Sequence, residues 1–314
     1  PALVAAAALA AAPAFAQDWP SKPIRLLVGS PPGAPSDIVA RSLVEQLGSS
    51  LGQPLVVENR PGAGLNLAAG HVAAAKPDGH TFLVTSDTVM TVNPLIYSKL
   101  TFDARKDLVP VSELASFTQM LICNAGLGVK TVDDLLKKAR ERELTYASGG
   151  SGVPGHLAAE MFLVQADVKM THIPYRGPGP AITDVVGGQV DCGFLTTPQV
   201  LPHVKSGALN ALAVSSAKRS AMAPEVPPAA EVGVPGMDAT FYQFLMAPAG
   251  TPKPIIDKMQ AAAAKALAAD AVQKRLAALD MEAIASTPEQ AAASLAAGAE
   301  RWAKIIERIN LKVD

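Results

Sequence analysis

The sequence predicts an α/β protein of two lobes joined by two crossing strands. Apolar strand-like runs alternate with helical patterns along the whole chain, which is typical of α/β folds. The chain has 314 residues, more than one hydrophobic core usually serves. Two apolar runs, at 109–126 and 240–250, suit strands that pass from one lobe to the other. Hydrophobic residues make up 49% of the chain and charged residues 18%, which fits a globular protein.

The segment 24–86 is expected to alternate strands and helices. The strands are IRLLVG at 24–29, PLVVEN at 54–59 and TFLVTS at 81–86, with helices at 36–51 and 65–75 between them. Each strand is an almost continuous apolar run, which is typical of strands with both faces buried. We therefore expect these strands to pair in parallel, with helices covering both faces of the sheet.

A second set of elements follows the first crossing run. A helix is expected at 131–142, with Thr131 as its N-cap and Asp134 in its first turn. The next expected elements are strands at 144–148, 170–175, 192–197 and 209–216 with helical segments between them. They are followed by a strand at 240–248, Ala-rich helices, a short strand at 282–286 and an amphipathic helix at 287–309.

The two crossing runs imply a discontinuous first lobe. The expected boundaries are 18–117 plus 243–314 for the first lobe and 118–242 for the second. In such a protein the carboxyl ends of parallel strands and the amino ends of helices converge on the cleft between the lobes, where a ligand would bind.

The amino-terminal sequence predicts a secretory signal peptide. Residues 1–16 are uncharged and mostly Ala, Leu and Val, and they end in Ala14-Phe15-Ala16, a small-residue cleavage pattern. We expect cleavage near Ala16/Gln17, an initiator Met and basic region before Pro1, and export to the periplasm. An Ala-rich disordered tail is the alternative. No later stretch of the sequence contains eighteen uncharged apolar residues.

Charge and composition narrow the function classes. A formal net charge of −1 argues against nucleic-acid binding, which requires a basic face. Aromatic residues make up 4%, so a base-stacking platform is not favoured. Cys123 and Cys192 permit a disulfide in an exported chain. Each also lies in an apolar strand-like run, where a buried thiol acts as a small hydrophobe, and we favour two free thiols.

The stretch SGGSGVPGH, residues 148–156, matches the dinucleotide pattern G-x-G-x-x-G between an expected strand and helix. Pro154 stands where the helix should donate amides, and an exported protein meets little NAD(P), so a dinucleotide is disfavoured. Glycines still allow consecutive N–H groups to face one concavity at a helix amino terminus, where a carboxylate fits as well as a phosphate. A tight turn without a ligand is the structural alternative.

Three further loops have a similar construction. SPPGAPSD at 30–37, RPGAG at 60–64 and TSDT at 85–88 each follow an expected strand, and three of the four loops are rich in Gly, Pro or Ser. Together they could direct amides and hydroxyls toward one cleft. The sequence therefore favours a receptor for a small anion.

Eight sequence blocks of the chain resemble those of one protein family and occur in the same order along the chain. They are WPSKPIRLLV (19–28), PPGAPSDIVAR (31–41), VENRPGAGLN (57–66), AAKPDGHTFLV (74–84), YASGGSGVPGHLAAEMF (146–162), HIPYRGPGPAITDVVGGQVD (172–191), RSAMAPEVPPAAEVGVPG (219–236) and APAGTPKPIIDKM (247–259). The sequence resembles the substrate-binding proteins of tripartite tricarboxylate transporters, the Bug family of periplasmic solute receptors. The resemblance implies a type II periplasmic-binding-protein fold, a small carboxylate or related polar ligand, membrane transporter subunits as partners, and no catalysis.

The resemblance also implies a set of ligand contacts. They are Ser30, Pro32, Gly33, Ala34, Asp37, Asn66 and Ser86 in the first lobe, Ser148, Gly149, Gly150, Ser151, His156, Tyr175, Asp191 and Thr196 in the second, and Phe241 at the hinge. Asp37 also suits an N-cap role, and His156 also suits capping or packing.

Four positions depart from the family pattern. At one of them, Val226-Pro227-Pro228 stands where relatives usually have VPT, a structural change expected to lie far from the ligand. Ala34 and Leu65 stand where relatives usually have glycine, and Leu65 would add bulk near the cleft. Asp87 is a carboxylate that many relatives lack. If Asp87 faces the cleft, it disfavours a second ligand carboxylate and favours an amine, amide or hydroxyl; surface exposure is the alternative.

The two alternative functions are an exported hydrolase and a receptor that signals to a membrane sensor. An exported hydrolase would need G-x-S-x-G, and Gly149-Gly150-Ser151-Gly152-Val153 fails at the last position. H-E-x-x-H is absent from the sequence, as is any C-x-x-C, so we expect no metal and no cofactor. A receptor that signals to a membrane sensor would use the same cleft as a transport receptor. We expect a monomer.

Overall fold

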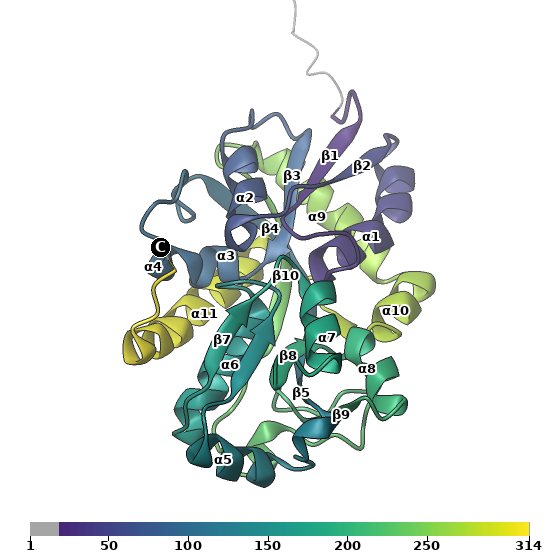
Figure 1. The fold of residues 1–314 in the computed structure, drawn as a ribbon. Coiled ribbons are helices and arrows are strands. Elements are labelled where there is room, and N and C mark those ends of the chain that lie inside the picture. Colours follow the sequence, from purple (N-terminus) through teal and green to yellow (C-terminus); the bar gives the residue numbers. More distant parts are fainter. Residues whose placement is uncertain (1–18, 314) are drawn as a thin grey trace, which may run out of the picture.

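The computed structural model describes residues 19–313 and forms two α/β lobes, each built on one mixed sheet (Figure 1). The first sheet has the strand order β11-β4-β10-β3-β1-β2, and the second has the order β7-β6-β8-β5-β9. The expected signal peptide and its cleavage point lie outside the described residues. Across 19–313, every helix is too short or too polar to cross a bilayer.

The elements have the following bounds. The strands of the first sheet are β1 (Ile24–Val28), β2 (Leu55–Asn59), β3 (Thr81–Ser86), β4 (Leu108–Phe117), β10 (Phe241–Pro248) and β11 (Met281–Ala283). Those of the second are β5 (Gln119–Asn124), β6 (Thr145–Ser148), β7 (Thr171–Pro174), β8 (Cys192–Thr196) and β9 (Leu209–Val214). The helices are α1 (Pro35–Leu51), α2 (Asn66–Ala73), α3 (Thr88–Thr91), α4 (Asn93–Ile96), α5 (Val132–Glu141), α6 (Pro154–Ala166), α7 (Pro178–Val186), α8 (Thr197–Lys205), α9 (Lys253–Leu267), α10 (Asp270–Ala277) and α11 (Pro288–Ile309).

Parallel pairing is confirmed for the strands that helices connect. β1 pairs in parallel with β2 and β3, and β6 pairs in parallel with β7 and β8. The strands nearest the lobe boundary are antiparallel: β10 to β3 and β4, and β5 to β8 and β9. These strands enter their sheets from the other lobe and not through a strand-helix-strand crossover, so the constraint that favours parallel pairing does not apply to them.

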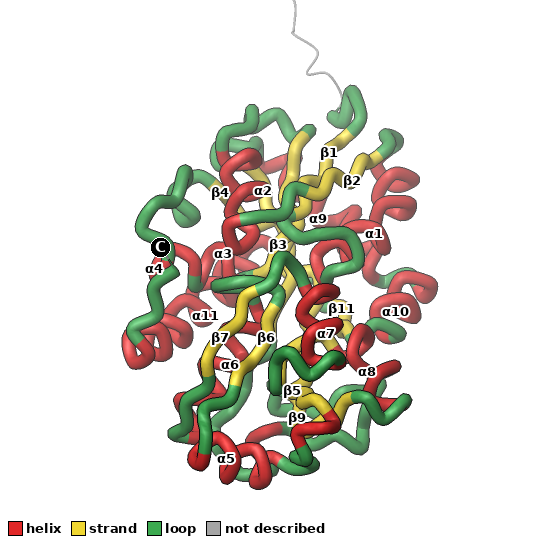
Figure 2. Tube along the Cα trace, viewed as in Figure 1, coloured by secondary structure: helices red, strands yellow, loops and turns green. Residues whose placement is uncertain are grey.

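The long apolar run at 109–126 contains two strands in different sheets. β4 ends at Phe117 in the first sheet and β5 starts at Gln119 in the second, with Thr118 between them. The chain returns through β10, whose first residue, Phe241, pairs with Phe117. Figure 2 shows the strands of the two lobes meeting in the middle of the molecule, with helices around them. The exact lobe boundaries at 117/118 and 242/243 stay a prediction.

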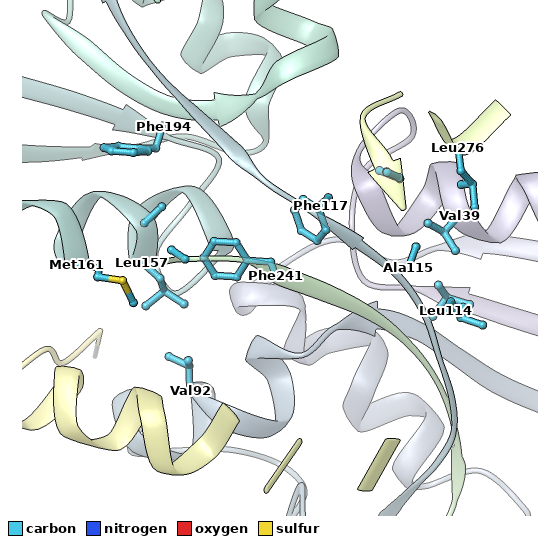
Figure 3. Close-up of a cluster of buried hydrophobic side chains, with 14 of the residues drawn as sticks. Val39, Val92, Leu114, Ala115, Phe117, Leu157, Met161, Phe194, Phe241 and Leu276 are labelled. Carbon is cyan, nitrogen blue, oxygen red and sulfur yellow. The ribbon is translucent and has the colours of Figure 1, made fainter. Parts of the chain in front are cut away.

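Aromatic side chains fill the core beside this crossing. Figure 3 shows Phe117 and Phe241 on neighbouring strands, and their ring centroids are 5.9 Å apart. Trp302 of α11 is fully buried and stacks on Phe241 at 5.7 Å. The amphipathic carboxyl-terminal helix therefore covers the crossing strands and joins the core of the first lobe.

Local sequence signals explain several helix starts. Thr131 accepts a hydrogen bond from the Asp134 amide and completes a capping box at α5, as the sequence predicts. Thr287 and Gln290 form the same motif at α11. Both boxes satisfy amide groups that would otherwise have no partner in the first turn.

The two cysteines form a disulfide, so the expectation of free thiols is wrong. Cys123 on β5 and Cys192 on β8 stand directly opposite each other in an antiparallel pair, and their sulfur atoms are bonded. Strand register brings the two residues together although 69 positions separate them in the sequence. That register is a tertiary property, and the local apolar context of each cysteine does not reveal it.

Candidate ligand-binding site

A cavity of about 570 Å³, which includes space open to solvent, lies between the lobes. Its walls come from both sheets: Ser30, Ala34, Ser36, Ser86, Phe117 and Gln243 belong to the first lobe, and Gln119, Gly149, Gly155, Gly177, Phe194 and Thr196 to the second. Pro31, Pro35, Leu65, Val153, Pro154, Pro178 and Leu195 complete the lining. None of these lining residues is charged, so polar recognition here depends on backbone groups, hydroxyls and amides.

Four helices begin at the cavity. The residues that precede α1, α6, α7 and α8 are Ala34, Val153, Gly177 and Thr196, and all four line the cavity. None of these helices has a side-chain hydrogen bond at its cap, in contrast to α5 and α11. In Figure 1, α7 and α8 of the second lobe lie directly below α1 of the first. Each of these helices has a proline, which carries no N–H, at its first or second position, so the remaining first-turn N–H groups and the positive ends of four helix dipoles are directed toward the same space.

Asp37 organises the first-lobe loop and does not line the cavity. It is the third residue of α1 and is buried. Its carboxylate accepts hydrogen bonds from Gly33 N–H (2.9 Å), Arg41 Nε (2.8 Å) and Asn59 Nδ2 (2.9 Å). The N-cap position belongs to Ala34. The carboxylate therefore ties loop 30–34 to the start of α1 and has its donors within the protein.

Asp87 is buried behind the cavity wall. It therefore neither faces the cleft nor lies exposed on the surface, the two alternatives that the sequence left open. Its side chain accepts hydrogen bonds from the hydroxyl of Ser86 (2.8 Å) and from the N–H of Tyr242 (3.2 Å). Burial raises the pKa of Asp87 to about 6, and these two hydrogen bonds oppose the increase. Asp87 is not itself part of the lining. It acts on the site through the hydroxyl of Ser86.

Two hydrogen bonds join the lobes beside the cavity. Tyr97 donates its hydroxyl to the carbonyl of Ser151 (3.1 Å), and Gln199 Nε2 donates to the carbonyl of Gly33 (3.3 Å). Each bond links a first-lobe segment to the start of a second-lobe helix. The described arrangement is therefore one in which the lobes touch.

The glycine-rich bend follows β6 and precedes α6, as the sequence predicts. Gly149 lines the cavity. Gly152 has φ 75°, a left-handed conformation that suits glycine. A side chain at Gly155 would place its Cβ 2.3 Å from the carbonyl oxygen of Phe194, so glycine lets α6 approach β8 closely. Gly150 also has a positive φ, of 141°, so all three glycines in the G-x-G-x-x-G pattern have conformational or packing roles.

A stack of aromatic rings supports this bend from below. The rings of His156 and His172 lie parallel at 3.9 Å, and Tyr146 stacks on His172 at 4.8 Å. His156 Nδ1 accepts the N–H of Gly152 (2.9 Å), and His172 Nε2 bonds the hydroxyl of Ser148 (2.7 Å). Both imidazoles are therefore attached to the bend and packed beneath it.

Both histidines are neutral at neutral pH. Burial lowers the pKa of His156 to about 3, with a smaller contribution from His172, and burial lowers the pKa of His172 to about 4. Glu160 accepts the hydroxyl of Tyr146 (2.5 Å), and its own pKa is raised by burial. The support of the bend carries no positive charge that could neutralise a ligand.

Five of the residues that the resemblance implies line the cavity. They are Ser30, Ala34, Ser86, Gly149 and Thr196. Others lie in or next to the loops that carry these residues and bond within the protein: Gly33, Asp37, Ser148, Gly150, Ser151, His156 and Tyr175. Pro32 is exposed at the loop tip, and the side chain of Asn66 accepts a hydrogen bond from Asn93. Ligand contact by any of them stays a prediction.

The structure removes two residues from the candidate site. Asp191 accepts hydrogen bonds from Thr145 N–H (2.8 Å) and from Arg142 (2.9 Å) at the start of β8. Thr196 lies at the other end of this five-residue strand, roughly 16 Å away at about 3.3 Å per residue. Phe241 is fully buried between Phe117 and Trp302, so the hinge aromatic that reaches the cavity is Phe117.

Sequence reasoning missed two glutamines. Gln119 and Gln243 both line the cavity and are buried. Each is the polar residue within an apolar crossing strand, which is the signal that could have identified them. The side-chain amide of Gln119 has no hydrogen-bond partner among the described residues, and Gln243 Oε1 accepts the hydroxyl of Ser36 (2.6 Å). Across residues 19–313, groups of three or more His, Cys, Asp or Glu side chains that could hold a metal ion are absent.

Comparisons with known proteins agree with this architecture. A family model described as the tripartite tricarboxylate transporter family receptor matches residues 39–311. Protein BugT of Bordetella pertussis is 36% identical over 306 residues, which cover 96% of this chain and 94% of BugT. The structure of periplasmic binding protein BugD matches with a TM-score of 0.86 and 28% identity, covering 94% of this chain and 99% of BugD. The R. palustris protein Rpa4515, solved with adipate, matches with a TM-score of 0.87 and 31% identity over 92% of this chain and 98% of its own.

Proposed function

Because the chain belongs to the tripartite tricarboxylate transporter receptor family and is a solute-binding receptor, we propose that it captures a small carboxylate between its lobes and delivers it to a transporter of that type. Rpa4515 holds adipate. The carboxylate is the group that the cavity of this chain is also suited to bind.

One observation carries the proposal: four uncapped helix starts face one cavity that has no charged side chain. An anion there would accept hydrogen bonds from first-turn amides and would be stabilised by the helix dipoles. A cation would meet only neutral oxygens and the positive helix ends. The arrangement therefore favours an anion, and apolar lining residues such as Phe117 and Phe194 favour an organic one.

The cross-lobe hydrogen bonds support closure around the ligand. A bound molecule that contacts both walls would stabilise the arrangement in which Tyr97 bonds Ser151 and Gln199 bonds Gly33. The membrane subunits would recognise this closed form. Export to the periplasm after cleavage near Ala16/Gln17, and action as a monomer, belong to the same proposal.

A charge-changing variant tests the proposal. Gln119→Glu keeps the shape of a side chain that lines the cavity and has no hydrogen-bond partner within residues 19–313. Two carboxylates about 4 Å apart repel by about 4 kcal/mol at an effective dielectric constant of 20. Carboxylate affinity should therefore fall at least a hundredfold at pH 8, measured by calorimetry with succinate, malate, adipate and benzoate.

Gln273→Glu is the matched control because Gln273 is exposed on α10 and lies outside the cavity. It introduces the same charge and should leave affinity within twofold. For wild type, ligand at a hundredfold excess over its dissociation constant should add about 2.7 kcal/mol of apparent stability. The proposal fails if no carboxylate binds the folded protein, or if Gln119→Glu binds carboxylates as tightly as wild type and the control do.

A further inference from the structure

The hydroxyl groups of the cavity differ in where their protons are donated. Ser30, Ser36, Ser86 and Thr196 line the cavity, and each carries one hydroxyl proton and two lone pairs. A hydroxyl that donates its proton to a protein acceptor can offer a ligand only a lone pair. The pattern of donation therefore fixes which ligand groups can bind beside each residue.

Ser86 donates its proton to the buried carboxyl group of Asp87 (2.8 Å). The amide of Thr88 lies 3.4 Å from the same oxygen, so at most one lone pair is used within the protein. Turning the hydroxyl toward a ligand would leave Asp87 with one hydrogen bond fewer in a site that water does not reach. Ser86 therefore remains an acceptor toward the cavity.

Thr196 on the opposite wall also donates its hydroxyl proton within the protein. Its hydroxyl donates to Gln199 Oε1, and the amide of Gln199 is held in that orientation because its Nε2 donates to the carbonyl of Gly33. Reversing the amide would place Oε1 against the carbonyl oxygen of Gly33 and lose the hydrogen bond that joins the lobes there. Thr196 thus also presents a lone pair, and it does so in the closed arrangement of the lobes.

Ser36 follows the same rule, whereas Ser30 does not. The hydroxyl of Ser36 donates to Gln243 Oε1 (2.6 Å). Ser30 is buried, and its hydroxyl oxygen has no hydrogen-bond partner among the described residues. Ser30 is therefore the lining hydroxyl that can donate to a ligand carboxylate, together with the first-turn amides of the four helices.

This distribution disfavours a second carboxylate beside Ser86 and Thr196. A second carboxylate beside Ser86 would face lone pairs and the carboxyl group of Asp87 behind them, and the lining contains no cation to compensate it. A hydroxyl or amide N–H would instead donate to Ser86 or Thr196. The body of the ligand would contact Leu65, Phe117 and Phe194, which are apolar lining residues.

We infer that the cavity selects monocarboxylates with an apolar body and a second end that carries a hydrogen-bond donor, such as a hydroxyl or an amide N–H, over plain dicarboxylates of the same length. This inference rests on the proposed function and narrows its substrate class. It distinguishes the preference of this chain from the adipate found with Rpa4515.

Two matched ligand series test the inference by calorimetry on the purified full chain at pH 7.5. The rigid series is 4-hydroxybenzoate, benzoate and terephthalate, and the flexible series is 6-hydroxyhexanoate, hexanoate and adipate. Within each series only the group opposite the first carboxylate changes. In every series that binds, the hydroxyl compound should bind at least tenfold more tightly than the other two, because its absence leaves a buried acceptor unpaired.

Variants locate the acceptor. Ser86→Ala or Thr196→Val should reduce the advantage of the hydroxyl compound over the unsubstituted acid to less than threefold. Ser206→Ala, at an exposed site after α8, is the control and should leave the advantage intact.

The outcomes separate the inference from the proposed function. If the dicarboxylate binds as tightly as the hydroxyl compound, or if both variants keep the full advantage, the inference is overturned and the carboxylate receptor stands. If neither series, nor succinate or malate, binds the folded chain, the proposed function is overturned as well.

Discussion

Replacing Asp87 by Asn should stabilise the protein at neutral pH and have little effect at acidic pH. The carboxyl group of Asp87 is fully buried, and burial raises its pKa from 3.8 to about 6. Arg301 on α11 lowers this pKa and Glu113 on β4 raises it, and both contributions are smaller than that of burial. Asn keeps an oxygen that can accept from Ser86 and from the N–H of Tyr242.

Stability falls as the pH rises because the pKa of Asp87 is higher in the folded chain than in the unfolded chain. Below pH 3.8 both forms are protonated, so ionisation of Asp87 does not affect stability. As the pH rises from 3.8 to 6 the unfolded chain loses this proton first, so the folded state becomes progressively less stable relative to it. Above pH 6 the penalty is constant. A pKa difference of about two units corresponds to about 3 kcal/mol, and Asn, which cannot ionise, removes this penalty.

Urea unfolding of wild type and Asp87→Asn at pH 4 and pH 7 measures the effect. The difference in unfolding free energy between the two proteins should increase by about 2 kcal/mol from pH 4 to pH 7, because the carboxyl group of the unfolded chain is already partly ionised at pH 4. Asp133→Asn, at an exposed site on α5, should change stability by less than about 0.5 kcal/mol at either pH. A difference between Asp87→Asn and wild type that is the same at both pH values would refute the reasoning.

Three further predictions concern packing, the disulfide and closure. Gly155→Ala should destabilise the protein by about 1–3 kcal/mol in thermal unfolding, since its Cβ would lie 2.3 Å from a backbone oxygen of β8, whereas Gly179→Ala meets no atom within 4 Å and should be neutral or stabilising. Replacing Cys123 and Cys192 together by Ala should cost about 4 kcal/mol in chemical unfolding, because the bridge closes a long loop in the unfolded chain; a loss below about 1 kcal/mol would contradict this explanation. Gln199→Ala removes a hydrogen bond to the first-lobe loop and should weaken carboxylate binding about fivefold by calorimetry, chiefly through faster dissociation; an unchanged dissociation rate would exclude a role in closure.

Local patterns in the sequence were sufficient to predict many elements of the fold. The periodicity predicted β3 at its observed bounds, and the Thr131–Asp134 pair predicted the start of α5 because a capping box is a local motif. The glycine-rich bend was recognised for a similar reason: a strand, a Gly-Ser turn and a helix lie next to each other in the chain. Such features depend on neighbouring residues and can be predicted without knowing the fold.

Only the tertiary structure decided how distant residues meet. Strand register joined Cys123 to Cys192, and the antiparallel pairing of β10 buried Phe241 and left Phe117 at the cavity. Hydrogen bonds between segments far apart in sequence determined that Gln199 reaches the first lobe.

The sequence by itself therefore determined the lobed α/β class, the loops that begin helices at the cleft, and the family. The structure decided which members of those loops line the cavity, that Asp87 lies behind Ser86, and where each hydroxyl proton is donated. The physical reason is that helix starts and turns depend on interactions within a few residues. The orientation of a side chain between two lobes depends on partners that folding brings from elsewhere in the chain.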